Sequence, residues 1–90
     1  MELEIGSVVF SKAGHDKGLF MAVVEIQDEY VLVCDGRQRP VDRPKRKNPI
    51  HLMKTNAKLT SEDTKSNHGL REALKRFNQK SAATSTKGGL

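Results

Sequence analysis

The chain has 90 residues, of which 36% are hydrophobic and 4% aromatic, so it can form only one small domain without a deep substrate cleft. Its net charge of +5 is unevenly distributed: residues 1–34 carry six acids and two lysines, whereas residues 35–90 carry fourteen basic residues and five acids. This asymmetry is typical of a protein whose partner is a polyanion. A solvated basic tail is the alternative explanation for part of the excess.

The cysteine count and the apolar segments exclude several further classes. Cys34 is the only cysteine, so the chain can form neither an intramolecular disulfide nor a zinc site built from several cysteines. The first residues, MELEIGS, begin with acids and lack the apolar core of a signal peptide. No apolar run reaches the length of a membrane span. We therefore expect a cytoplasmic protein with no membrane contact.

The first part of the chain predicts short strands. Three apolar runs rich in Val and Phe, separated by turn-forming residues, occupy residues 5–11, 19–26 and 30–34. The second run is apolar almost throughout, which is typical of a strand that is buried on both faces or that crosses a small barrel. These runs indicate a fold that is mainly β.

The next segment predicts the end of the β region. Asp35-Gly36 is a hairpin signal, and the two prolines that follow restrict residues 35–44 to an edge strand or a long loop. Residues 48–55 can supply one last strand. Five short strands with no helix between them predict a small twisted or closed antiparallel barrel over residues 1–56.

The second half predicts a helix. Residues 57–65 are polar and are expected to form a linker with helix-capping candidates. Four apolar residues then recur at the spacing i, i+3, i+4 and i+7, namely Leu70, Ala73, Leu74 and Phe77. This stripe predicts an amphipathic helix over residues 66–79, followed by a disordered tail over residues 80–90. The stripe either packs on the chain's own barrel, which we favour, or docks into a groove of a partner protein.

Residues 12–18 form a basic loop with two glycines. Gly14 and Gly18 allow a tight connection and remove the side chains that would keep another backbone, such as a phosphodiester, at a distance. Lys12 and Lys17 flank that exposed backbone with positive charge. An ordinary hairpin loop explains the same pattern equally well.

A second basic segment, GRQRPVDRPKRKNP, interrupts the β pattern. Its prolines keep it extended, and a semi-rigid strip of charge can meet several phosphates of a nucleic-acid strand. A solvated charge run or a targeting signal is the alternative. If the strands form a small barrel, both basic segments can emerge at one end. The RNA-binding candidates in the two segments are Lys12, Gly14, His15, Lys17, Gly18, Arg37, Arg39, Arg43, Lys45, Arg46 and Lys47.

The aromatic residues are too few for base-by-base reading of single-stranded RNA. We expect Phe10 and Phe20 in the core and Phe77 on the helix stripe, which leaves Tyr30 as the only ring with a chance of exposure, although core placement is favoured for Tyr30 too. Recognition of folded RNA through phosphates, 2′-hydroxyls and shape is therefore favoured. The three histidines lack metal-ligand spacing and no catalytic group of residues is evident, so we expect no metal, no cofactor and no enzyme activity.

Residues 5–26 resemble a KOW motif: a strand, a glycine-containing turn, a Lys-Gly pair and a second apolar strand. The matching positions are Gly6, Val8, Val9, Gly14, Lys17, Gly18, Val23 and Val24. The continuation YVLVCDGRQRPVDRPKRKNPIHL is similar to the ribosomal branch of that family, the fourteen-e, six-e and twenty-seven-e types of large-subunit protein. The whole chain resembles small bacterial stand-alone KOW proteins.

This resemblance implies an SH3-like barrel of about five strands with a C-terminal amphipathic helix. It also implies that Gly14, His15, Lys17 and Gly18 form an RNA-facing loop. Transcription-factor versions of the motif usually carry a glycine where this chain has Met21, which favours a ribosomal role in translation. We expect the protein to be a monomer whose main partner is ribosomal RNA, with ribosomal proteins as secondary partners. The alternatives are a protein-interaction adaptor and a nucleic-acid-binding transcription accessory protein.

Overall fold

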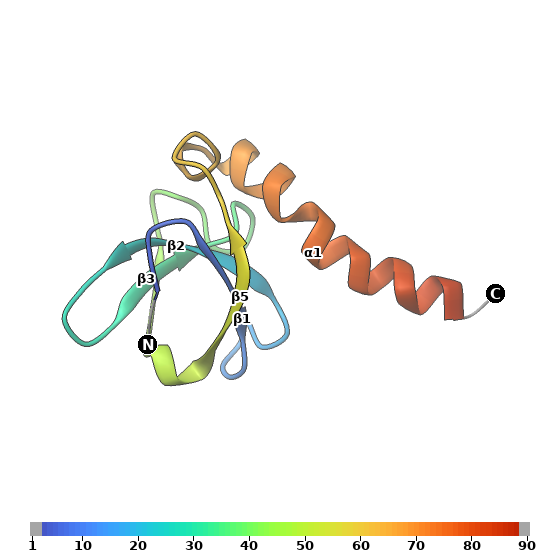
Figure 1. The fold of residues 1–90 in the computed structure, drawn as a ribbon, viewed down its shortest axis with the longest axis horizontal. Coiled ribbons are helices and arrows are strands. Elements are labelled where there is room, and N and C mark those ends of the chain that lie inside the picture. The colour runs from blue at the N-terminus through green and yellow to red at the C-terminus, as the bar shows by residue number, and fades with distance from the viewer. Residues whose placement is uncertain (1–2, 89–90) are drawn as a thin grey trace.

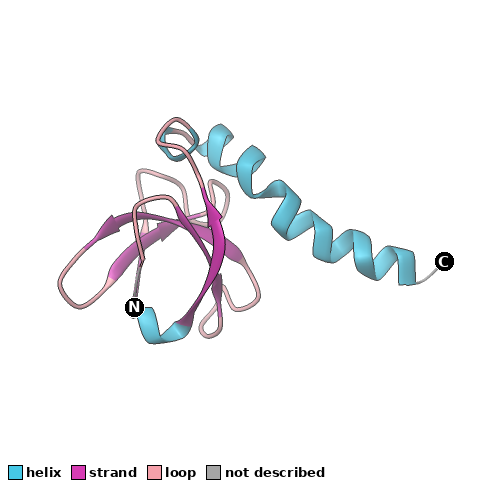
Figure 2. Cartoon of the chain, viewed as in Figure 1, coloured by secondary structure: helices cyan, strands magenta, loops and turns pink. Residues whose placement is uncertain are grey.

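The computed structural model describes residues 3–88 of the chain and the side chains of residues 3–78. Five strands form one sheet, and a long helix follows them, whose C-terminal part extends away from the sheet (Figures 1 and 2). The elements are β1 (Ser7–Ser11), β2 (Phe20–Ile26), β3 (Val31–Cys34), β4 (Lys45–Lys47), the 3-10 turn η1 (Pro49–His51), β5 (Leu52–Lys58), the 3-10 turn η2 (Asp63–Lys65) and α1 (Asn67–Gly88).

The strands lie in the order β4-β3-β2-β1-β5, and all neighbouring strands are antiparallel. The prediction of a mainly β fold with a C-terminal helix is confirmed. The sheet is open between β4 and β5 in the described residues, so closure into a barrel is not seen. Irregular pairing between Ser7 and Val9, and again between Val23 and Glu25, strengthens the twist of these strands.

The central strand β2 is buried on both faces, as its apolar sequence predicts. Met21 and Val23 belong to one core cluster, whereas Ala22 belongs to the other. Side chains alternate between the two faces of a strand, so a strand with a core on each side must be apolar at successive positions.

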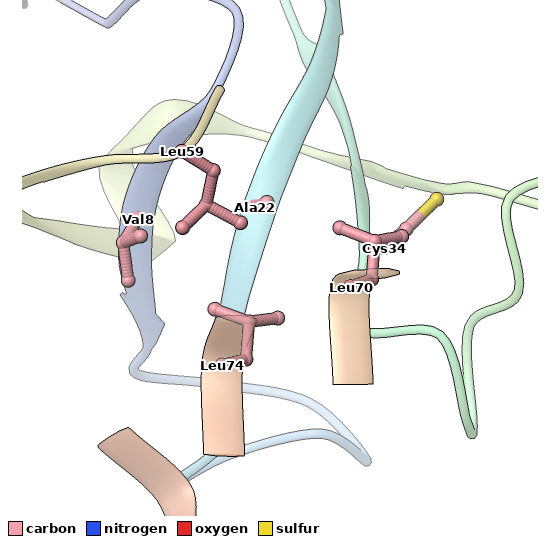
Figure 3. Close-up of a cluster of buried hydrophobic side chains, with 6 residues drawn as sticks. All are labelled: Val8, Ala22, Cys34, Leu59, Leu70 and Leu74. Atoms are coloured by element: carbon pink, nitrogen blue, oxygen red, sulfur yellow. The ribbon is translucent and has the colours of Figure 1, made fainter. Parts of the chain in front are cut away.

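The helix α1 covers one face of the sheet. Leu70 and Leu74 are fully buried there against side chains from β1, β2, β3 and the segment after β5 (Figure 3). The ring of Phe77 lies 5.5 Å from that of Phe20. Ser66 caps the N-terminus of the helix, because its hydroxyl accepts a hydrogen bond from the Gly69 N–H at 2.9 Å. The predicted packing of the apolar stripe on the chain's own sheet is confirmed.

The opposite face of the sheet carries the second core cluster. Its members are fully or almost fully buried and come from four strands: Val9, Met21, Val23, Val31, Val33 and Leu52. Because α1 lies on the other face, the sheet must curve around these residues to exclude water from them. The same curvature brings the β1–β2 connection close to the edge strand β4.

The boundaries in the second half differ from those predicted. β5 continues to Lys58, two residues past the expected end of the β domain, and η2 lies inside the expected linker. The helix continues to Gly88, whereas the sequence predicts its end at residue 79 and a disordered tail after it. No glycine or proline interrupts residues 70–87, so a helix that is nucleated by packing at Leu70 and Leu74 can propagate. Residues 89–90 of the expected tail lie outside the described residues.

Candidate nucleic-acid interface

The connection between β1 and β2 is a compact loop with an open backbone face. Gly14 and Gly18 have φ angles of 87° and 90°, which L side chains rarely adopt, and the Gly18 N–H donates to the carbonyl of Ser11 at 2.9 Å. A Cβ at Gly18 would meet no atom of the described residues within 4 Å. Lys12 and Lys17 are exposed on either side. The backbone at Gly18 is therefore accessible to a partner's backbone, whereas a Cβ at Gly14 would lie 3.2 Å from Nζ of Lys47.

Asp16, the single acid of this loop, points inward and fastens the loop to the sheet edge. Its side chain is 1% exposed, and its Oδ1 accepts a hydrogen bond from the Ser11 hydroxyl at 2.9 Å. The same oxygen lies 3.0 Å from Nζ of Lys47, which also donates to the carbonyl of Ala13 at 2.7 Å. Lys47 ends β4, so this buried ion pair joins the first basic segment to the second.

The ionisation of Asp16 follows from these contacts. Burial by itself would raise the pKa of its carboxyl, but hydrogen bonds from Lys47 and Ser11 and the positive charge of Lys47 outweigh burial and hold that pKa below the ordinary value of 3.8. The carboxylate is therefore charged at neutral pH. We call the contacts of Asp16 with Ser11 and Lys47 the latch.

Arg39 adds a second cation to the latch. Its Nε lies 4.0 Å from Oδ2 of Asp16, and neither of these two buried atoms has a hydrogen-bond partner within the described residues. The Arg39 side chain is 30% exposed. Lys47 and Arg39 therefore face the single carboxylate of Asp16, which leaves one positive charge in excess. This excess charge reaches the surface at the exposed part of the Arg39 side chain.

The β3–β4 connection presents its arginines on a tightly organised turn. Oδ1 of Asp35 accepts hydrogen bonds from the backbone N–H groups of Arg37 and Arg39 at 3.0 and 2.8 Å. The Arg43 N–H donates to the carbonyl of Pro40 at 2.9 Å, which makes a second turn. The predicted turn at Asp35-Gly36 is thus present, and residues 35–44 form the long loop that the sequence predicts as one of two alternatives. Arg37 and Arg43 are exposed on it.

The predicted basic strip does not face in one direction. Lys45 and Lys47 lie on one side of β4 and Arg46 on the other, because side chains alternate along a strand. The guanidinium of Arg46 lies over the ring of half-buried Tyr30, 4.9 Å from its centroid. Lys47 is 7% exposed and its charge is already paired, so it is not available to a partner in this conformation.

The remaining candidates are spread over the surface. Exposed positions are Lys12, Gly14, His15, Lys17, Gly18, Arg37, Arg43 and Arg46, and half-buried positions are Arg39 and Lys45. The latch brings the β1–β2 loop together with Arg39 and Lys47, whereas Arg46 lies apart on the Tyr30 side. We call the basic side chains of the two connections that the latch joins the basic pole: Lys12, His15, Lys17, Arg37, Arg39 and Arg43.

The importance of Asp16 is not evident from its sequence alone. The available signal is its position as one acid between two glycines and two lysines, a pattern that fits a solvated carboxylate as well as a buried one. Over residues 3–88, no three His, Cys, Asp or Glu side chains lie close enough to hold a metal ion. In the same range no helix is both long and apolar enough to cross a bilayer.

Comparison with known proteins adds no family to this description. No protein-family model matches the chain, and no curated protein matches it significantly. The resemblance to KOW proteins therefore stays a prediction that rests on the residues quoted above.

Proposed function

We propose that the protein binds structured RNA through the basic pole. The observation that carries this proposal is the latch, because it joins two basic segments that lie far apart in the sequence. On the connections that it joins, Lys12, Lys17 and Arg43 are exposed, while Arg39 is half-buried beside Asp16. Several cations on one part of a small fold suit a partner with regularly spaced negative charges.

The chemistry of the pole favours phosphate and shape recognition. Arginine can bind a phosphate through two hydrogen bonds, and the open backbone at Gly18 lets a phosphodiester approach closely. Stacking platforms are scarce: Phe20 and Phe77 pack against the core, and Arg46 lies over the ring of Tyr30. Unstacked bases therefore have few rings on which to lie.

The identity of the RNA is proposed from the resemblance to the ribosomal KOW branch. In that proposal the curved sheet is an SH3-like barrel, the protein is a monomeric cytoplasmic component or visitor of the ribosome, and it has no catalytic role. The adaptor alternative loses its expected docking surface, because Leu70 and Leu74 of the helix stripe are buried in the chain's own core.

The test is the salt dependence of RNA binding by charge variants. The double variant Lys12→Ala/Lys17→Ala should bind labelled fragments of ribosomal RNA more weakly than the unaltered chain. The plot of log K against log salt concentration has a negative slope, and the magnitude of this slope should decrease by about 0.7–0.9 for each phosphate that the variant no longer neutralises. Arg43→Ala should act in the same direction.

The matched control is the double variant Lys65→Ala/Arg76→Ala, which removes the same charge elsewhere. Lys65 lies in η2, at the end of the molecule opposite the β1–β2 loop (Figure 1), and Arg76 lies on α1 over the ring of Phe77. Equal reductions of affinity and slope in both double variants would show that net charge, and not the basic pole, governs binding.

A further inference from the structure

We propose that the groove between α1 and the turn after β3 is a second phosphate-binding site, which makes the helix part of the RNA-binding surface. This inference rests on the proposed function. The groove has a volume of about 410 Å³, which is the size of many small-ligand sites. Three of its lining side chains are cationic and come from two segments: Arg37 from the turn, and Arg71 and Lys75 from the helix.

The two walls of the groove are fixed to each other by direct contacts. Nη1 of Arg71 donates to the carbonyl of Gly36 at 3.0 Å, and Oδ1 of Asn67 accepts from the Val41 N–H at 2.8 Å. Gly36 packs so closely that a Cβ there would lie 2.4 Å from the carbonyl oxygen of Asn67. The groove is therefore built into the fold, and its shape does not depend on a partner.

The floor of the groove is also held in place. Asn78 pairs with the backbone of Phe20: its Oδ1 accepts from the N–H at 2.9 Å and its Nδ2 donates to the carbonyl at 3.3 Å. Leu74 is 1% exposed and anchors this turn of α1 in the core. Arg71 and Lys75, one helical turn apart, are exposed on the same groove.

The charge of the groove favours an anion. Two acids also line it, but Asp35 is only 6% exposed and its Oδ1 accepts two backbone hydrogen bonds, so it contributes little to the accessible surface. Glu72 is exposed and is the acid that a bound phosphate would meet. Three cations against two carboxylates still leave the groove with a net positive charge.

The groove adjoins the basic pole, because Arg37 belongs to both. Leu19, which lines the groove, directly follows Gly18 of the β1–β2 loop. Gln38, another lining residue, directly precedes Arg39, which faces Asp16 of the latch. A strand whose phosphates contact the pole can therefore continue over the turn into the groove. This continuity favours a phosphate of the same RNA as the ligand over a free nucleotide.

Two substitutions of opposite sign test the site. Lys75→Ala should weaken binding of ribosomal RNA fragments by up to about fivefold, the effect of one exposed ion pair, and should lower the salt slope by about 0.7–0.9. Glu72→Gln should tighten binding. Arg76→Ala and Glu62→Gln are the matched controls, because they make the same charge changes outside the groove, and both should leave binding nearly unchanged.

The pattern of outcomes separates this inference from the proposed function. If Lys12→Ala/Lys17→Ala weakens binding while Lys75→Ala and Glu72→Gln behave like their controls, the basic pole stands and the groove is refuted. If none of these variants changes binding, both are refuted. Adenosine monophosphate supplies the free-nucleotide arm: if it saturates the amide shifts of Gln38 and Asn78 while RNA leaves them unchanged, the groove takes a small nucleotide and the proposal is overturned.

Discussion

Replacing Asp16 by asparagine removes the charge of the latch but keeps its shape. In Asp16→Asn the amide oxygen can still accept hydrogen bonds from Ser11 and Lys47, so the substitution mainly leaves the ammonium of Lys47 without a counter-ion. Lys47 is 7% exposed and cannot easily reach water without moving β4 or the β1–β2 loop. The structure therefore predicts a loss of stability out of proportion to a one-atom change.

The size of this loss follows from the burial of the pair. Removing one partner of a buried ion pair typically costs about 3–5 kcal/mol. Because Lys47 keeps the carbonyl of Ala13 as an acceptor at 2.7 Å, we expect the lower end of that range, about 3 kcal/mol. With an m-value of about 1–1.5 kcal/mol per molar urea, the unfolding midpoint should fall by about 2–3 M.

Urea unfolding followed by far-ultraviolet circular dichroism measures this shift. The control is Glu4→Gln, which breaks the exposed pair with Lys58 and should leave the midpoint almost unchanged. Adding Lys47→Met to Asp16→Asn should restore part of the stability, because no buried charge is then left unpaired. A midpoint for Asp16→Asn equal to that of Glu4→Gln would refute the view that the latch holds the loop to β4.

Three further results are expected. Because the pKa of Asp16 is lower in the folded state than in the unfolded state, its contribution is complete above about pH 4 and is lost as pH falls through the folded pKa, so Asp16→Asn should show a shallower acid limb in pH-dependent unfolding. Gly36→Ala should destabilise the protein more than Gly18→Ala in thermal unfolding. Both substitutions place alanine at a positive φ, which costs about 1–2 kcal/mol, but of the two sites only Gly36 has no space for a Cβ. Equal destabilisation would contradict the close contact between Gly36 and α1. Burial raises the pKa of the Cys34 thiol to about 11, so iodoacetamide should alkylate it only after unfolding, and rapid labelling of the folded chain would show that α1 opens readily.

Features that depend on local periodicity could be predicted from the sequence. The continuous apolar run around Met21 indicates a strand with a core on each side, and the structure gives β2 that position. The spacing of Leu70 and Leu74 indicates a helix with one buried face, and both side chains are buried. These signals are contained within one element, so they do not require knowledge of which segments meet.

Features that depend on long-range pairing could not be predicted. In the sequence, Lys47 cannot be distinguished from the other basic residues beside it. Only the folded sheet places its side chain against the buried Asp16. Arg71 and Lys75 resemble ordinary solvated positions of an amphipathic helix until the turn at Gly36 is placed against them. The order of the strands could not be predicted either, because no local pattern specifies that β4 pairs with β3 and that β5 pairs with β1.

Amide chemical-shift mapping with a ribosomal RNA fragment is the most direct test of the proposed interface. We predict that the largest shifts cluster in residues 12–18 and 36–43, on the two connections that the latch joins. The acidic β2–β3 turn, residues 27–30, serves as the internal reference and should remain unshifted. Shifts confined to that turn, or confined to only one of the two basic connections, would contradict a shared RNA-binding pole.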